Sequence, residues 1–89
     1  MDYGLYGKIA MVTGTASQVG IGKAICLTLA KEGCSIVSVD LDLEGAKLTA
    51  IEVMALGHKS IAMKVDVANS SEVDKMTDAV LKEFGKIDI

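Results

Sequence analysis

The chain has 89 residues, which is enough for one small domain but not for two separate hydrophobic cores. Hydrophobic residues make up 51% of it and its mean hydropathy is +0.42, so it is too apolar for a disordered chain. Its net charge is −3 and it contains no arginine, which leaves no basic face for nucleic acid. No apolar run reaches the roughly 20 residues of a membrane helix, and no basic and apolar leader follows Met1. We therefore expect a cytoplasmic protein with no nucleic-acid or membrane partner.

Three short apolar runs predict buried β-strands. They are residues 8–13, which stop at Gly14, residues 34–39, which stop at Asp40, and residues 60–65, which are followed by an aspartate. Runs of this length without helical periodicity are typical of strands that are covered on both faces.

The stretches between these runs predict three helices. The first covers residues 20–31, the second follows a cap at Asp42 and is closed by Gly57, and the third ends at Gly85. Asn69, Ser70 or Ser71 is expected to cap the third helix, with Ser71 and Asp74 resembling a capping box. The spacing of apolar residues predicts the inward faces: Ile21, Ala24, Ile25, Thr28 and Leu29; then Leu48, Ile51, Met54 and Ala55; then Val73, Met76, Val80 and Phe84.

This alternation predicts the α/β class. We expect the first half of a Rossmann-type doubly wound parallel sheet, with three strands, three helices and the start of a fourth strand at residues 86–89. In the strand order 3-2-1-4, a chain that stops inside the fourth strand leaves the first strand as an unpaired apolar edge. We therefore expect residues 1–89 to form a single partial dinucleotide-binding domain, the N-terminal part of a longer chain.

A glycine-rich loop, residues 13–22, connects the first predicted strand to the first predicted helix, which is the context of a dinucleotide pyrophosphate site. Gly14 is expected to allow the sharp turn, Gly20 to let the backbone approach the pyrophosphate, and Gly22 to let the helix pack closely. Free N–H groups at the helix start supply the anion site. Ser17 and Ile21 complete the predicted cofactor-binding residues of this loop.

Two aspartates end the second and third predicted strands at the same edge of the sheet. Asp40, followed by Leu41, is expected to accept hydrogen bonds from the adenosine ribose hydroxyls. Asp66 is placed to reach the adenine amino group, and the Val67 backbone to face the ring. A 2′-phosphate would meet like charge at Asp40 and find no arginine to clamp it, so NAD(H) is predicted over NADP(H).

Four segments together resemble the short-chain dehydrogenase/reductase family: residues 5–14, 20–25, 66–67 and 84–89, with the sequences LYGKIAMVTG, GIGKAI, DV and FGKIDI. The resemblance covers nearly the whole chain. It is closest to the classical branch, whose Thr-Gly-x-x-x-Gly-x-Gly loop matches Thr13, Gly14, Gly20 and Gly22. Two extra residues lie between Gly14 and Gly20, and we expect this insertion to bulge around residues 17–19 and alter contacts with the ribose or pyrophosphate.

The resemblance implies an NAD(H)-dependent oxidoreductase that acts on a small-molecule alcohol or carbonyl substrate, a 3-oxoacyl thioester being one candidate. In this family the catalytic Ser, the Tyr-x-x-x-Lys pair and an Asn lie in later segments, so residues 1–89 would supply the adenosine-binding half and no catalytic residue. Neither Tyr3 nor Tyr6 has a Lys four residues later, and both are expected to form a partly buried N-terminal anchor. The family also implies a homodimer or homotetramer for the complete protein.

Two other classes of function fit the same residues. An S-adenosylmethionine-dependent methyltransferase also uses a glycine-rich first turn and an acidic residue after the second strand, although the pairs Thr13-Gly14 and Asp66-Val67 favour the dehydrogenase. A non-catalytic dinucleotide-binding module is the third candidate, and a Tyr-x-x-x-Lys segment after Ile89 in the parent protein would argue against it.

The remaining reactive residue types predict no further site. Cys26 and Cys34 are expected to be core residues, and His58 to lie in a solvated turn at the end of the sheet opposite the cofactor. We predict no metal centre.

Overall fold

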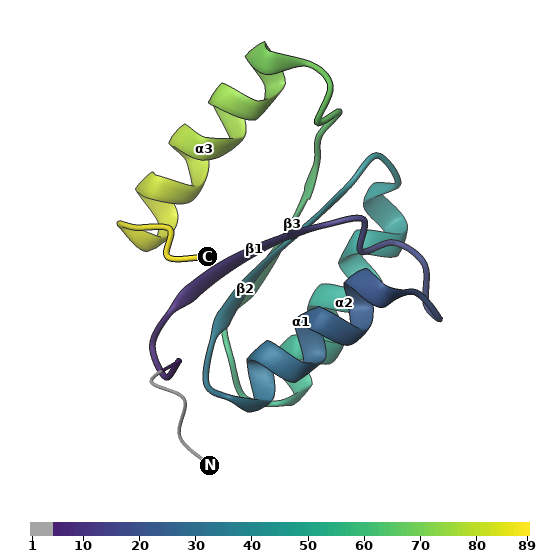
Figure 1. Ribbon diagram of the computed structural model, residues 1–89, viewed down its shortest axis with the longest axis vertical. Helices are drawn as coiled ribbons and strands as arrows, with labels where there is room; N and C mark the ends of the chain where they lie inside the picture. Colours follow the sequence, from purple (N-terminus) through teal and green to yellow (C-terminus); the bar gives the residue numbers. More distant parts are fainter. Residues whose placement is uncertain (1–4) are drawn as a thin grey trace.

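The computed structural model describes residues 5–89 and contains one parallel sheet of three strands (Figure 1). The strands are β1 (Ile9–Thr13), β2 (Ser35–Asp40) and β3 (Ser60–Lys64), in the spatial order β1-β2-β3. The order and direction are those of the predicted half of a doubly wound sheet, and the predicted strands differ from the observed ones by one residue at some ends.

Residues 86–89 lie beside the outer edge of β1, where the fourth strand was predicted. The Asp88 N–H donates to the Ile9 carbonyl at 2.9 Å, and the Met11 N–H donates to the Ile89 carbonyl at 2.9 Å. The Ile9 N–H donates to the Asp88 carboxylate at 2.8 Å, so a side chain takes the place of a backbone acceptor. The expectation of an unpaired β1 edge is therefore wrong, because these few residues already bond to it.

The helices cover both faces of the sheet (Figure 1). Helices α1 (Ile21–Lys31) and α2 (Leu43–Ala55) pack on one face, and α3 (Ser70–Phe84) packs on the other. Successive residues of β2 alternate between the two layers: Ile36 packs in the cluster with α1 and α2, and Val37 packs in the cluster with α3. Burial on both faces explains why the strands read as continuous apolar runs.

The helix ends follow the predicted caps with one exception. Asp42 caps α2 by accepting a hydrogen bond from the Gly45 N–H, and Gly85 ends α3 in the left-handed conformation. At the start of α3, Asn69 is the cap and accepts from the Glu72 N–H at 3.2 Å. The predicted capping box at residues 71 and 74 is wrong, because Asn69 has extended backbone angles and the helix already begins at the next residue.

The predicted inward face of α2 is wrong, and so is that of α1 apart from Leu29, which is partly buried against the core. Cys26 and Ala30 are the buried residues of α1, whereas Ile21 is 80% exposed. In α2 the predicted residues Leu48, Ile51, Met54 and Ala55 are all exposed, and the buried face consists of Gly45, Ala46, Thr49, Ala50 and Val53. Small side chains face inward because the helix lies close to its neighbours: a Cβ atom at Gly45 would meet atoms of Ala16 at 2.6 to 2.8 Å.

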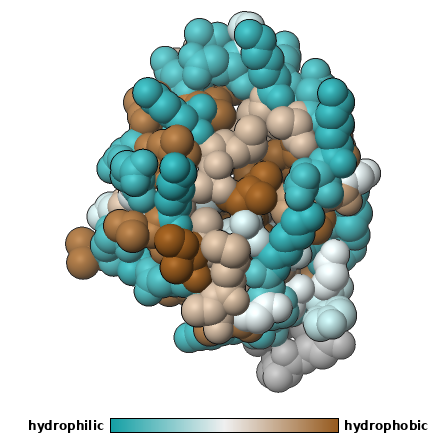
Figure 2. Space-filling model, turned by 180° about the vertical axis from the view of Figure 1, so that it is seen from behind, coloured by the Kyte–Doolittle hydropathy of each residue, from teal (hydrophilic) through white to brown (hydrophobic). Residues whose placement is uncertain are grey.

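The predicted face of α3 is confirmed, since Met76 and Val80 are buried and Val73 and Phe84 are partly buried against the same cluster. Apolar side chains also reach the surface, and Figure 2 shows them in the middle and at the lower left of the rear face, between hydrophilic borders.

Both cysteines are buried core residues, as predicted. Burial raises the pKa of the Cys26 thiol to about 11 and also raises that of Cys34. Tyr6 is 83% exposed, so the expectation of a partly buried anchor is wrong for this residue; Tyr3 lies outside the described residues. His58 is partly buried in the turn after α2, next to the start of β3.

Within residues 5–89, the structure contains no helix with the length and apolarity needed to cross a membrane. The same residues contain no group of three or more His, Cys, Asp or Glu side chains arranged to hold a metal ion.

Candidate functional site

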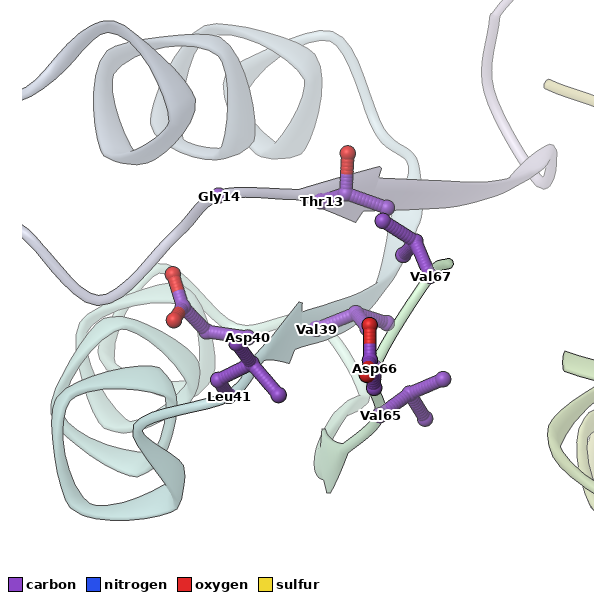
Figure 3. Close-up of a pocket in the computed structure, with 8 residues that line it drawn as sticks. All are labelled: Thr13, Gly14, Val39, Asp40, Leu41, Val65, Asp66 and Val67. Carbon is purple, nitrogen blue, oxygen red and sulfur yellow. The ribbon is translucent and has the colours of Figure 1, made fainter. Parts of the chain in front are cut away.

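A pocket of about 280 Å³ lies at the carboxyl ends of all three strands (Figure 3). In an open parallel sheet this edge is where ligands bind. Five of the nine predicted cofactor-binding residues line the pocket, although they come from three separate segments of the chain. The lining consists of Thr13, Gly14, Val39, Asp40, Leu41, Val65, Asp66 and Val67.

The pocket combines an apolar surface with two carboxylates. Val39 and Val65 are buried, whereas Leu41 and Val67 are each 60% exposed. Figure 3 shows Asp40 and Leu41 on one side of the pocket and Val67 on the other. This arrangement suits a flat apolar ring between the exposed aliphatic side chains, with polar groups directed at the acids.

Asp40 is held in place by two backbone donors. One carboxylate oxygen accepts from the Ala16 N–H at 3.0 Å, and the other accepts from the Asp42 N–H at 3.0 Å. These bonds, first that from Asp42 and then that from Ala16, lower the pKa of Asp40. The group is therefore ionised at neutral pH, and each oxygen retains a lone pair for a further donor.

Asp66 is fixed by the turn that leads into α3. Its carboxylate accepts from the Ala68 N–H at 2.9 Å, and its own N–H donates to the Glu72 carboxylate at 3.2 Å. The side chain therefore lies at the pocket wall with one carboxylate oxygen committed to the local backbone.

The glycine loop is anchored to β2 and α2 by a buried threonine that the sequence did not single out. Gly14 turns the chain with a φ of +71°, and the next residue, Thr15, is fully buried. The Thr15 hydroxyl donates to the Val39 carbonyl at 3.2 Å and accepts from Ser38 at 2.8 Å, while its carbonyl accepts from the Thr49 hydroxyl at 2.7 Å. Three hydroxyl side chains thus fix the loop; their only sequence signal was their presence in segments with apolar neighbours.

A β-turn spans residues 17–20 of the loop, where the two-residue insertion was expected to bulge. The Gly20 N–H donates to the Ser17 carbonyl at 3.2 Å, which closes a turn with Gln18 and Val19 at its two central positions. Ser17 is exposed, and a Cβ atom on Gly20 would lie 3.0 Å from the Ser17 Cβ. The turn brings its two ends together, so the insertion projects from the loop instead of lengthening the path to α1.

Helix α1 begins directly after this turn. A Cβ atom on Gly22 would overlap the Gly14 carbonyl oxygen and lie 2.8 Å from the Gly14 carbonyl carbon, so only glycine allows this approach. The N–H groups of Ile21 and Gly22 have no hydrogen-bond partner among the described residues, as expected for the first turn of a helix. Ser17, Gly20, Ile21 and Gly22 thus lie on the loop and helix start, outside the lining of the pocket itself.

A strand, a glycine loop and a helix start that meet a carboxylate after the next strand form the arrangement of a dinucleotide site. The profile of the short chain dehydrogenases matches residues 8–89. The chain belongs to this family.

Among its relatives, D-threitol dehydrogenase of Mycolicibacterium smegmatis is 43% identical over 88 residues, which are 99% of this chain and 33% of that protein. The crystal structure of a hydroxysteroid dehydrogenase from Escherichia coli superposes with a TM-score of 0.88 at 34% identity, covering 96% of this chain and 35% of the other. An NAD⁺-bound xylitol dehydrogenase gives a TM-score of 0.88 at 33% identity, covering 94% of this chain and 32% of the other.

The chain thus spans about a third of the length of the curated relatives that it matches. The matched residues, 8–89, include the glycine loop described above.

Proposed function

We propose that residues 1–89 form the adenosine-binding part, a single partial domain, of an NAD(H)-dependent oxidoreductase that acts on an alcohol or carbonyl substrate. The observation that carries this proposal is the ionised Asp40 carboxylate, which lies at the wall of the pocket and accepts a hydrogen bond from the glycine loop at Ala16.

The pocket matches the chemistry of an adenosine. Two vicinal ribose hydroxyls are donors, and the free lone pairs of Asp40 are acceptors at the same edge of the sheet. Leu41 and Val67 offer apolar contacts for the adenine ring, and Asp66 lines the same pocket as an acceptor for the adenine amino group. The pyrophosphate would then lie over the helix start, where the N–H groups of Ile21 and Gly22 have no hydrogen-bond partner within residues 5–89.

Charge favours NAD(H) over NADP(H). A 2′-phosphate on the ribose would stand against Asp40, and Asp42 is exposed two residues away. Like charges in such a site cost several kcal/mol. The sequence has no arginine to form a bidentate phosphate clamp. The bound cofactor of the xylitol dehydrogenase neighbour, NAD⁺, supports the same preference.

The substrate is proposed only as a class. The relatives named above act on a polyol or a hydroxysteroid, so their names favour alcohol and carbonyl compounds but no single one, and they give no support to a 3-oxoacyl thioester over the others. The Ser, Tyr and Lys that would carry out proton transfer, and a homodimeric or homotetrameric assembly, are predicted for the parent protein outside residues 1–89.

The test is a titration of the 89-residue chain with NADH and with NADPH, followed by the same titrations of Asp40→Ala. We expect the unmodified chain to bind NADH more tightly. Loss of charge-assisted hydrogen bonds, about 1.5–3 kcal/mol each, should weaken NADH binding by about ten- to a hundredfold. NADPH binding should change much less, because its 2′-phosphate no longer meets a charge.

Asp78→Asn is the control, because Asp78 is an exposed carboxylate on α3. An NADH preference that survives in Asp40→Ala would overturn the ribose assignment. If the chain bound S-adenosylmethionine and neither NADH nor NADPH, the methyltransferase alternative would be favoured. A parent protein that binds NADH but turns over no alcohol or carbonyl compound would favour the non-catalytic module.

A further inference from the structure

Gln18, in the inserted turn of the glycine loop, ties that turn to α2. Its side-chain nitrogen lies 3.0 Å from the Ala16 carbonyl oxygen, 3.2 Å from the Gly45 carbonyl oxygen and 3.5 Å from the Thr49 hydroxyl. An amide has two N–H donors, so the two shorter contacts satisfy it. One donor therefore holds the loop to itself, and the other holds it to the first turn of α2.

The oxygen of the same amide connects the turn to α1. It accepts a hydrogen bond from the Lys23 ammonium at 3.1 Å, and that ammonium also forms an ion pair with Glu52 of α2. Lys23 is the third residue of α1 and is largely buried, with 17% of its side chain exposed. The inserted turn is thus fixed to both helices through one side chain.

The other central residue of the turn has no such role. Val19 is 98% exposed, so its side chain has almost no packing surface with which to fix the turn. The two central residues of the turn therefore differ: the amide of Gln18, at the surface, bonds the turn to α1 and α2, whereas Val19 points into solvent. Val19 is a matched control for Gln18 within the same turn.

We propose that Gln18 is a positioning residue of the dinucleotide site, which fixes the inserted turn so that the N–H groups of Ile21 and Gly22 are held ready for the pyrophosphate. The inference rests on the proposed function. A loop that is ordered before binding does not lose conformational entropy at the moment of binding, and affinity rises accordingly. In this proposal Gln18 acts through the backbone that it holds.

The test compares three ligands on the 89-residue chain by titration monitored with NMR: NADH, ADP and adenosine. NADH and ADP carry the pyrophosphate, whereas adenosine occupies only the strand-end pocket. In Gln18→Ala, the loss of one or two ordinary hydrogen bonds should weaken NADH and ADP binding by about three- to tenfold and leave adenosine binding unchanged. Val19→Ala should change none of the three affinities.

Gln18→Glu separates the donors from the acceptor. A carboxylate of the same shape still accepts from Lys23 but offers no N–H group to the Ala16 and Gly45 carbonyls. We expect this variant to bind NADH at least as weakly as Gln18→Ala does. In the unliganded chain, backbone order parameters of residues 17–23 should fall in both Gln18 variants and stay unchanged in Val19→Ala.

The outcomes separate this inference from the function on which it rests. Failure of the unmodified chain to bind NADH or ADP would remove the proposed function and the inference together. Normal NADH binding by Gln18→Ala, or unchanged order parameters, would overturn the inference and leave the proposed function intact. An equal loss for adenosine would show that Gln18 supports the fold in general and does not position the pyrophosphate loop.

Discussion

Replacement of Gly22 by alanine should both destabilise the chain and weaken dinucleotide binding. The added Cβ would overlap the Gly14 carbonyl oxygen, lie 2.8 Å from the Gly14 carbonyl carbon and lie 3.2 Å from the Thr13 carbonyl oxygen. These are backbone atoms, so no side chain can rotate to make room. Helix α1 must move away from the loop instead, and its N–H groups move with it.

The expected loss of stability follows from two opposed effects. Forcing an additional carbon into a packed position costs typically 1–3 kcal/mol. Alanine in place of glycine stabilises a helix by up to about 1 kcal/mol. The free energy of unfolding should therefore fall by about 1–2 kcal/mol, which lowers the melting temperature by roughly 5–15 °C in a domain of this size.

Urea unfolding followed by far-ultraviolet circular dichroism measures this change. A lower midpoint at an unchanged slope would mean that stability has changed without a change in the surface exposed on unfolding. Ile21→Ala is the control, because Ile21 is in the same helical turn and is 80% exposed. An unchanged midpoint for Gly22→Ala would refute the close approach of α1 to the loop, and full retention of NADH binding would show that the helix start does not hold the pyrophosphate.

Three further predictions concern single side chains. Backbone hydrogen bonds lower the pKa of Asp40, so its ionised form stabilises the fold above the unfolded pKa of about 3.9. The stability difference between the unmodified chain and Asp40→Asn, measured by urea unfolding, should therefore shrink as the pH falls below about 4. A difference that stays constant with pH would mean that those bonds are absent. Val53→Ala should lower the free energy of unfolding by about 2 kcal/mol because Val53 is fully buried, whereas exposed Ile51 can be replaced by Gln at a cost of less than about 0.5 kcal/mol. If Ile51→Gln lowers the melting temperature more than Val53→Ala does, the predicted inward face of α2 is correct after all. Alkylation of Cys26 should require unfolding, because its thiol is buried and its pKa is raised to about 11, and fast labelling of the folded chain by iodoacetamide, read by mass spectrometry, would contradict its core position.

The sequence was sufficient for the order of elements and for the pocket. Continuous apolar runs locate strands that are buried on both faces, and the glycine and aspartate positions that end them locate the binding edge. Gly14, Asp40, Leu41, Asp66 and Val67 were predicted from three distant segments, and all five line one pocket. Their shared location could be predicted from one rule alone, that the carboxyl ends of parallel strands lie at the same edge of a sheet.

The packing of the helices was beyond the pattern of hydrophobicity. Apolar side chains occur on both sides of α2, and the larger ones, such as Ile51, dominate any periodicity although they face outward. The buried side carries small residues, such as Gly45 and Ala46, which are needed because they let α2 pack close to its neighbours and not because they are hydrophobic. Spacing alone does not distinguish a face chosen for size from a face chosen for apolarity.

The contacts of the glycine loop were also beyond the sequence. Thr15, Gln18 and Thr49 are polar residues of types that usually lie at the surface, and nothing in their spacing relates residue 18 to residue 45. Such contacts depend on how two segments meet in space.

The hydrogen bond from the Ile9 N–H to the Asp88 carboxylate is a titratable contact at the outer edge of β1. The neighbouring hydrogen bonds at this edge join two peptide groups, which do not titrate, whereas this one joins a peptide N–H to a carboxylate. The pKa of Asp88 is lowered chiefly by that hydrogen bond, with a contribution from Lys86. The bond to the ionised carboxylate is therefore present at neutral pH and is lost in acid. Acid should therefore remove this one contact between residues 86–89 and β1 while the backbone hydrogen bonds at Ile9 and Met11 remain, so the strength with which these residues are attached to β1 depends on pH.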